Sequence, residues 1–226
     1  MANSQNIWAA TLHEDGGSFF RRSLDSTKAF PTDALDDLPE LDFEDHGWMG
    51  DDGFVLSPTR TTTKHKAFGG QTVMTTQDDY ECTVTATIYE QNIITLKTIF
   101  GDENVRVDYE SGHAKFEIEW DDRMLPRSSF ATRWITGRKT GIDVIEEGQI
   151  TEIADIERVQ NQLVKFTVTI DVYKPKSGRK GIYTLLDDPD DTSGASGNGG
   201  TGGTGGTAAA ARPGRTAAVA GGAGAD

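Results

Sequence analysis

The chain has 226 residues and a formal net charge of −14, from 36 acidic and 22 basic residues. A chain this acidic is a poor candidate for a protein that grips duplex DNA, because such binding needs Lys and Arg to neutralise phosphates. Cys82 is the sole cysteine, which excludes an internal disulfide and a zinc site built on several cysteines. No apolar run is long enough for a membrane span or a secretion signal, so we expect synthesis in the cytoplasm and no membrane partner.

Residues 1–53 are predicted to form an N-terminal arm and a long acidic loop. Nine acidic residues crowd between Pro31 and Asp52. Apolar residues interrupt them at Leu35, Leu38, Leu41, Phe43 and Trp48. A long loop of this kind is uncommon in a compact domain unless it is functional or contacts a partner. The alternative is that its leucines fold back on their own domain, and the sequence leaves both interpretations open.

From Phe54 onward the pattern is that of β-strands, expected at 54–60, 71–76, 80–89, 105–110, 114–120, 130–136, 141–145 and 163–173. Apolar and polar residues alternate most clearly in 80–88, 114–120 and 164–172. Such alternation is typical of antiparallel strands with one buried and one wet face. In the second of these strands Lys115, Glu117 and Glu119 form the polar face, and Phe116 and Trp120 are expected on the buried one. Cys82 falls in the first, where a small buried apolar side chain is the expected role.

One helix is predicted at about 90–100, where apolar residues recur at spacings of three and four, and Gly101 is a plausible end. Residues 150–159 remain ambiguous between helix and strand, because isoleucines recur every three residues while β-branched content favours a strand. The predicted fold is mainly β: an antiparallel β-sandwich or barrel over 54–186 with one short α-helix packed on it.

The last segment, 187–226, has a different composition. It contains no aromatic residue and holds 12 of the 26 glycines. Such a sequence buries too little apolar surface to offset the entropy lost on ordering it. We therefore expect a flexible Gly/Ala/Thr-rich tail.

Catalytic and metal-binding patterns were not found. The four histidines lie far apart without metal-ligand spacing, and no phosphate loop, dinucleotide turn or nucleophile elbow occurs. Glu117 and Glu119 would lie about 7 Å apart on one strand face, a distance compatible with an inverting glycosidase pair. A solvated strand face explains them better, so we expect no enzyme, no cofactor and no metal site, and an acid-pair hydrolase is the last alternative.

Several stretches taken together resemble the tail tube (major tail) proteins of siphophages, notably those of actinobacteriophages. They are GFVLSP at 53–58 leading to AFGGQTV at 67–73; TVTATIY at 83–89 followed by the helix at 92–100; and GQITEI at 148–153 with FTVTI at 166–170 and GIY at 181–183. No single motif is diagnostic, and the order and spacing of the set over residues 50–186 carry the resemblance.

The resemblance implies a structural virion protein that forms hexameric rings, each subunit lending strands to a barrel around a lumen. Stacked rings would form the tail tube that conducts DNA into the host, with tape-measure, tail terminator and distal tail proteins as partners. The loop with Leu35, Leu38, Leu41, Phe43 and Trp48 would contact the neighbouring ring. Lys115, Glu117 and Glu119 are candidates to line the lumen, where an acidic surface would let DNA slide without binding it. The alternatives are a tube protein of a type VI or contractile secretion system, and a monomeric β-sandwich decoration or binding module.

Overall fold

The computed structural model describes residues 18–110, 113–136 and 139–187. The chain divides into two units, Met1–Pro189 and Asp190–Asp226, and every described residue belongs to the first. Most of the predicted tail at 187–226 therefore lies outside the described residues.

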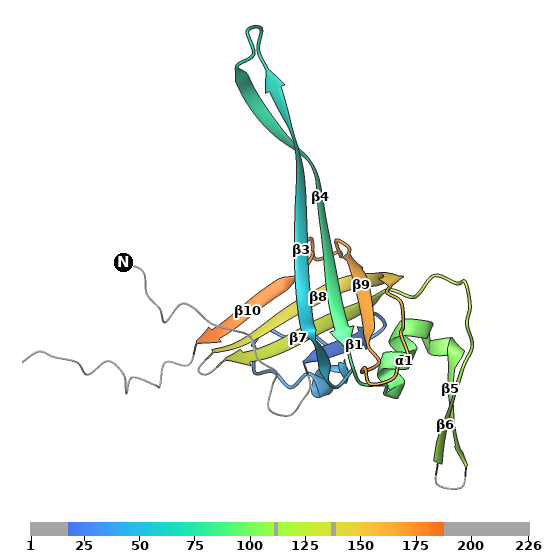
Figure 1. Ribbon diagram of the computed structural model, residues 1–226. Helices are drawn as coiled ribbons and strands as arrows, with labels where there is room; N and C mark the ends of the chain where they lie inside the picture. The colour runs from blue at the N-terminus through green and yellow to red at the C-terminus, as the bar shows by residue number, and fades with distance from the viewer. Residues whose placement is uncertain (1–17, 111–112, 137–138, 188–226) are drawn as a thin grey trace, which may run out of the picture. The chain divides into compact units, whose positions relative to one another are not determined.

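The first unit is built on one large antiparallel sheet (Figure 1). Its strands run in the order β2 (Glu44–Asp45), β1 (Phe19–Ser23), β7 (Ser128–Thr136), β8 (Lys139–Ile153), β9 (Phe166–Val172), β4 (Thr72–Ile88) and β3 (Met49–Lys66). β10 (Ile182–Asp187) pairs with the first part of β8, and β9 pairs with its second part. A separate two-stranded sheet joins β5 (Val105–Glu110) to β6 (His113–Ile118). The predicted class, mainly β with antiparallel strands, is confirmed.

Two buried clusters lie against this sheet. The larger contains the alternating apolar side chains of β4 and β9 together with Phe19, Phe130 and Ile145, and Cys82 is part of it. The smaller joins Phe20, Ala131, Ile142 and Val144 to Ala34, Leu38 and Phe43. Adjacent residues of β1 and β7 thus enter different clusters, so these strands are covered on both faces. The segment between β1 and β3 supplies the second cover.

The described residues contain one α-helix, α1 (Ile93–Phe100), which packs on the sheet as expected, with Ile99 in the larger cluster. It begins later than residue 90 because the Asn92 side chain accepts a hydrogen bond from the Thr95 backbone N–H at 2.8 Å, which is the role of an N-cap residue. Two 3₁₀ turns, η2 (Pro39–Leu41) and η3 (Asp102–Asn104), complete the described helical elements. The ambiguous stretch 150–159 resolves into the end of β8 followed by irregular chain.

Candidate interaction surfaces

The most prominent surface feature is a long two-stranded ribbon formed by β3 and β4. β9 pairs with β4 only from Thr83 to Ile88, whereas β3 and β4 stay paired as far as Lys66 and Thr72. Residues 58–82, which we call the ribbon, therefore extend beyond the sheet (Figure 1). Every residue from Val55 to Thr75 is exposed. The ribbon consequently has no core of its own.

Local contacts give the ribbon its shape. Pro58 is tolerated within β3 because this strand is the edge of the sheet and needs no further ladder partner. At the base, the Lys180 ammonium donates to the Tyr80 carbonyl at 2.8 Å, and the Arg60 guanidinium lies over the Tyr80 ring, 4.6 Å from its centroid. At the tip, Gly69 and Gly70 adopt positive φ values of 104° and 86°, which glycine allows at little cost.

The ribbon also differs in charge from the rest of the chain. Residues 53–77 contain no acidic residue, yet they contain Arg60, Lys64 and Lys66. Phe68 at the tip is fully exposed, and Val73 and Met74 are more than half exposed. Asp78, Asp79 and Glu81 follow in the part of β4 nearer the sheet. Only the outer part of the ribbon, 58–77, therefore presents a basic surface with apolar side chains.

The acidic loop predicted as an inter-ring contact folds largely onto its own sheet. Leu38 and Phe43 are buried in the smaller cluster, and Leu41 packs against it. These three side chains are therefore not exposed contact residues on this chain, because the apolar face of β1, β7 and β8 needs a cover. Leu35 and Trp48 do lie on the surface, 65% and 57% exposed.

The acidic side chains of this loop face outward. Exposed acids lie at Asp33, Asp37, Glu40, Asp42, Glu44, Asp51 and Asp52. Lys28 pairs with Asp42 at 2.7 Å, and its hydrogen bond holds the pKa of that carboxyl below the usual value. The Tyr89 hydroxyl donates a hydrogen bond to Asp51 at 2.6 Å. The Lys165 ammonium lies 3.5 Å from the Asp52 carboxylate. The loop is therefore an acidic surface laid over a buried apolar underside.

A buried histidine links the end of the loop to β1 and α1 by hydrogen bonds. His46 is fully buried between β1 and α1, and its ring nitrogens lie 3.0 Å from the Phe19 carbonyl and 2.9 Å from the Thr98 hydroxyl. Desolvation lowers the pKa of His46 from 6.5 to about 3. The imidazole is thus neutral: Nδ1 donates to the carbonyl, which can only accept, and Nε2 accepts from Thr98.

The predicted lumen residues lie on the β5–β6 hairpin. Lys115 and Glu117 form an ion pair at 2.8 Å, and Arg106 lies 3.5 Å from Glu119. The hydrogen bond from Lys115 lowers the pKa of Glu117. Each carboxylate is more than half exposed and paired with a base. That arrangement is typical of a solvated strand face and leaves little net negative charge there.

The expectation of a buried face on this hairpin is wrong. Phe116 and Trp120 are 42% and 83% exposed, and Tyr109 on the paired strand is 82% exposed. Trp120 stacks on the Phe100 ring with centroids 6.5 Å apart. On the same face, Val105 is buried and Val107 and Ile118 are half-buried. Nothing within the described residues covers the outer part of that face.

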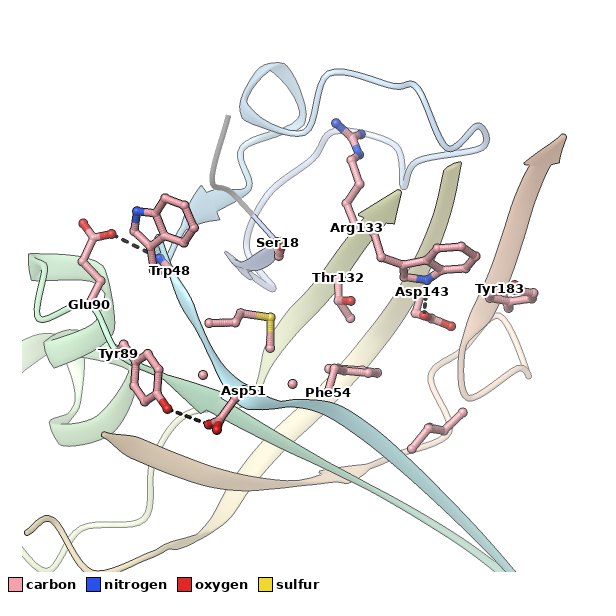
Figure 2. A pocket seen from close by; sticks show the side chains of 15 residues that line it. Ser18, Trp48, Asp51, Phe54, Tyr89, Glu90, Thr132, Arg133, Asp143 and Tyr183 are labelled. Carbon is pink, nitrogen blue, oxygen red and sulfur yellow. Dashed lines mark hydrogen bonds between the residues drawn. The ribbon is translucent and has the colours of Figure 1, made fainter. Parts of the chain in front are cut away.

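A groove opens between β3 on one side and β7, β8 and β10 on the other (Figure 2). It encloses about 1200 Å³ and is lined mainly by apolar and aromatic surface. Trp134 and Tyr183 stack at 6.1 Å on one wall, and Phe54 and Leu56 belong to the other. Gly141 is required behind the Trp134 ring, since a Cβ there would lie 1.9 Å from a ring carbon. The groove combines residues from four strands, so sequence patterns alone could not reveal it.

Comparisons with known proteins do not identify a relative. No protein-family model matches this sequence, and no curated protein matches it. Over residues 18–110, 113–136 and 139–187 there is no group of three or more His, Cys, Asp or Glu side chains that could hold a metal ion. In the same part of the chain no helix has the length and apolar character needed to cross a membrane.

Proposed function

We propose that this chain is a tail tube protein of a long-tailed bacteriophage, which self-assembles into stacked hexameric rings around a lumen that conducts DNA. The sequence resemblance over residues 50–186 suggests this family, and the confirmed mainly β fold with one helix is compatible with it. The proposed location is the virion, with the tape-measure, tail terminator and distal tail proteins as partners.

The observation that carries the proposal is the ribbon at 58–82. An isolated two-stranded ribbon is marginally stable in water, and exposed apolar side chains such as Phe68, Val73 and Met74 favour burial against a partner. Nine residues of β3 from Pro58 to Lys66 span about 30 Å, which is close to the diameter of a small domain. A segment of this length can reach a neighbouring molecule.

A second copy of the chain is a suitable partner for the ribbon. The outer part of the ribbon, 58–77, is basic, whereas the loop between β1 and β3 presents exposed acids that include Asp33, Asp37 and Glu40. Opposite charges on two different patches of one molecule favour a head-to-tail contact. Contacts of this kind generate rings when the rotation closes and open helical filaments when it does not, and a second such contact can stack the rings. In this arrangement the exposed carboxylates of the acidic loop bind the ribbon of the next copy. Leu38 and Leu41 of the loop stay packed in the smaller cluster of their own chain.

The lumen in this proposal carries DNA without binding it. DNA bears about one negative charge per 1.7 Å of its axis, so an acidic wall repels it and avoids the counterion release that drives tight binding. The net charge of −14 supplies such a wall. Lys115, Glu117 and Glu119 remain candidates for it, although their ion pairs reduce the charge that they contribute.

The test is assembly of the purified full chain, followed by negative-stain microscopy and analytical ultracentrifugation at rising concentration. We expect rings or tubes with a central hole. Reversing the ribbon charges in R60E/K64E/K66E should raise the concentration needed for assembly at least about tenfold, because the charge match is lost. K174E/K176E, with the same kind of change at exposed lysines of the body, is the matched control.

Two outcomes contradict the proposal. A wild-type chain that stays monomeric at high concentration, also with the tape-measure protein present, is a monomeric module and not a tube subunit. A ribbon variant that assembles at the wild-type concentration shows that the ribbon charges do not make the contact.

A further inference from the structure

The groove between β3 and β10 is larger than a small ligand needs. Small-molecule sites usually enclose about 300–1,000 Å³, and this one encloses about 1200 Å³. Three carboxylates, Asp51, Glu90 and Asp143, lie around its apolar lining (Figure 2). Burial raises the pKa of Asp143, to which the Trp134 indole donates at 3.4 Å. The groove therefore suits an apolar chain segment that brings no further negative charge.

The described chain begins inside this groove. Ser18, the first described residue, lines it and is 3% exposed. Its carbonyl accepts from the Arg133 backbone N–H at 2.8 Å, which fixes the direction of entry beside β7. Among the described residues, the Ser18 Oγ atom is buried without a hydrogen-bond partner. A buried polar group without a partner costs about 1–3 kcal/mol, so the Ser18 hydroxyl favours a polar chain segment next to it.

The seventeen residues ahead of Ser18 have the required composition. Ile7, Trp8 and Leu12 are apolar, with two alanines between them. The first of the 36 acidic residues is Glu14, so residues 1–13 contain no carboxylate. They would therefore add no negative charge to a groove that already holds three carboxylates. Gly16 and Gly17 immediately precede Ser18 and permit a sharp turn. From Ser18, six extended residues reach Leu12 within about 20 Å.

We infer that the groove is the docking site of residues 7–12 of the same chain, with Trp8 and Leu12 buried against the aromatic walls. The backbone that follows them supplies a hydrogen-bond partner for Ser18 Oγ. This inference does not depend on the tube function, because it concerns one copy of the chain.

Hydrogen–deuterium exchange on the full chain, at a concentration low enough to keep it monomeric, tests the inference. The amides of residues 7–12 should exchange at least about tenfold more slowly than those of a synthetic peptide of the same sequence. Leu56→Glu places a charge on the groove wall and should return these amides to the peptide rate. Val55→Glu changes the neighbouring residue of the same strand, which points to the other face and is equally exposed, 50% against 51%. It should leave the protection intact.

Protection of β7 and β8 in the same experiment reports whether each variant is folded. If Leu56→Glu unfolds the sheet, Trp8→Ser replaces it, because that substitution changes no residue of the described sheet and removes only the indole. Rapid exchange of residues 7–12 in the wild type, or protection that Leu56→Glu and Trp8→Ser both leave unchanged, overturns the inference. Protection that rises with protein concentration also overturns it, since the groove would then hold a segment of a second copy.

Discussion

The acidic loop buries most of its apolar residues, whereas the outer part of the ribbon exposes them. The loop between β1 and β3 has irregular sequence, yet Leu38 and Phe43 are buried on the sheet. The ribbon has a regular strand sequence, yet Phe68, Val73 and Met74 are exposed. Spaced apolar residues in a loop are therefore no guide to a contact surface. A better guide is a pair of strands that extends beyond the end of its pairing with the rest of the sheet, as β3 and β4 do.

The largest expected effect is a loss of folding stability when a buried side chain of the loop is removed. Leu38→Ala should lower the free energy of unfolding by about 2–5 kcal/mol, because it removes a fully buried side chain and leaves a cavity. Leu35→Ala, at an exposed position three residues earlier, should change it by less than about 0.5 kcal/mol. Urea denaturation of both variants measures the difference. Equal effects would mean that the loop does not cover the sheet in solution.

The pH dependence of stability tests the buried histidine under the loop. His46 is buried under the loop, and its pKa is lowered to about 3 by desolvation, whereas His65 lies exposed on the ribbon. Between pH 6.5 and about 3 the unfolded chain binds a proton at His46 that the folded chain does not. Stability should therefore fall as the pH is lowered through this window, by at most about 1.4 kcal/mol per pH unit.

The matched variants are His46→Gln and His65→Gln, each followed by chemical denaturation at several pH values. The first should flatten the acid-side slope, and the second should leave it unchanged. The raised pKa values of Asp45 and Asp143, both due to desolvation, act in the opposite direction and remain in every variant. An unchanged slope in His46→Gln would show that His46 is accessible to protons in the folded chain.

Much of the fold could be predicted from the sequence, since alternation in β4 and β9 identified two strands and their buried faces. β1 was missed because its sequence, FFRRS, does not alternate: Phe19 and Phe20 enter different clusters on the two faces of the sheet. Arg21 and Arg22 also appear unsuited to a buried strand. Arg21 forms an ion pair with Asp102 at 2.5 Å, and Arg22 lies over the rings of Phe30 and Phe43. Such partners lie too far away in the chain to be inferred from local pattern.

The surfaces were less predictable than the strands. Alternation in 114–120 shows which side chains share a face, but it carries no information on whether another layer covers them. The ribbon and the groove depend on where β9 and β10 stop pairing with their neighbours. The absence of acids from 53–77 was a signal present in the sequence, and it would have identified the outer part of the ribbon, 58–77, as a distinct surface.

At the tip of the ribbon, Phe68→Ser should separate assembly from folding. The side chain is fully exposed, so the free energy of unfolding of the monomer should change by less than about 0.5 kcal/mol. If the tip is buried in a neighbouring copy, losing the ring should raise the concentration required for assembly about tenfold or more. Sedimentation velocity at several concentrations measures this shift. Tyr109→Ser on the β5–β6 hairpin, also highly exposed, shows whether any exposed aromatic has the same effect.

The smallest effect on folding is expected at the candidate lumen residues. Glu117 and Glu119 are exposed and ion-paired within their hairpin, and solvent screening makes such pairs contribute little to stability. The double variant Glu117→Lys and Glu119→Lys should therefore keep the wild-type melting temperature and the wild-type tube morphology. It should nevertheless slow DNA ejection if the hairpin lines the lumen, because lysines would hold phosphates that the native surface repels. That delay should shrink as salt is added, since the attraction is electrostatic. Normal ejection at low salt would place the β5–β6 hairpin outside the lumen, and its exposed apolar side chains would then be assigned to a contact between subunits.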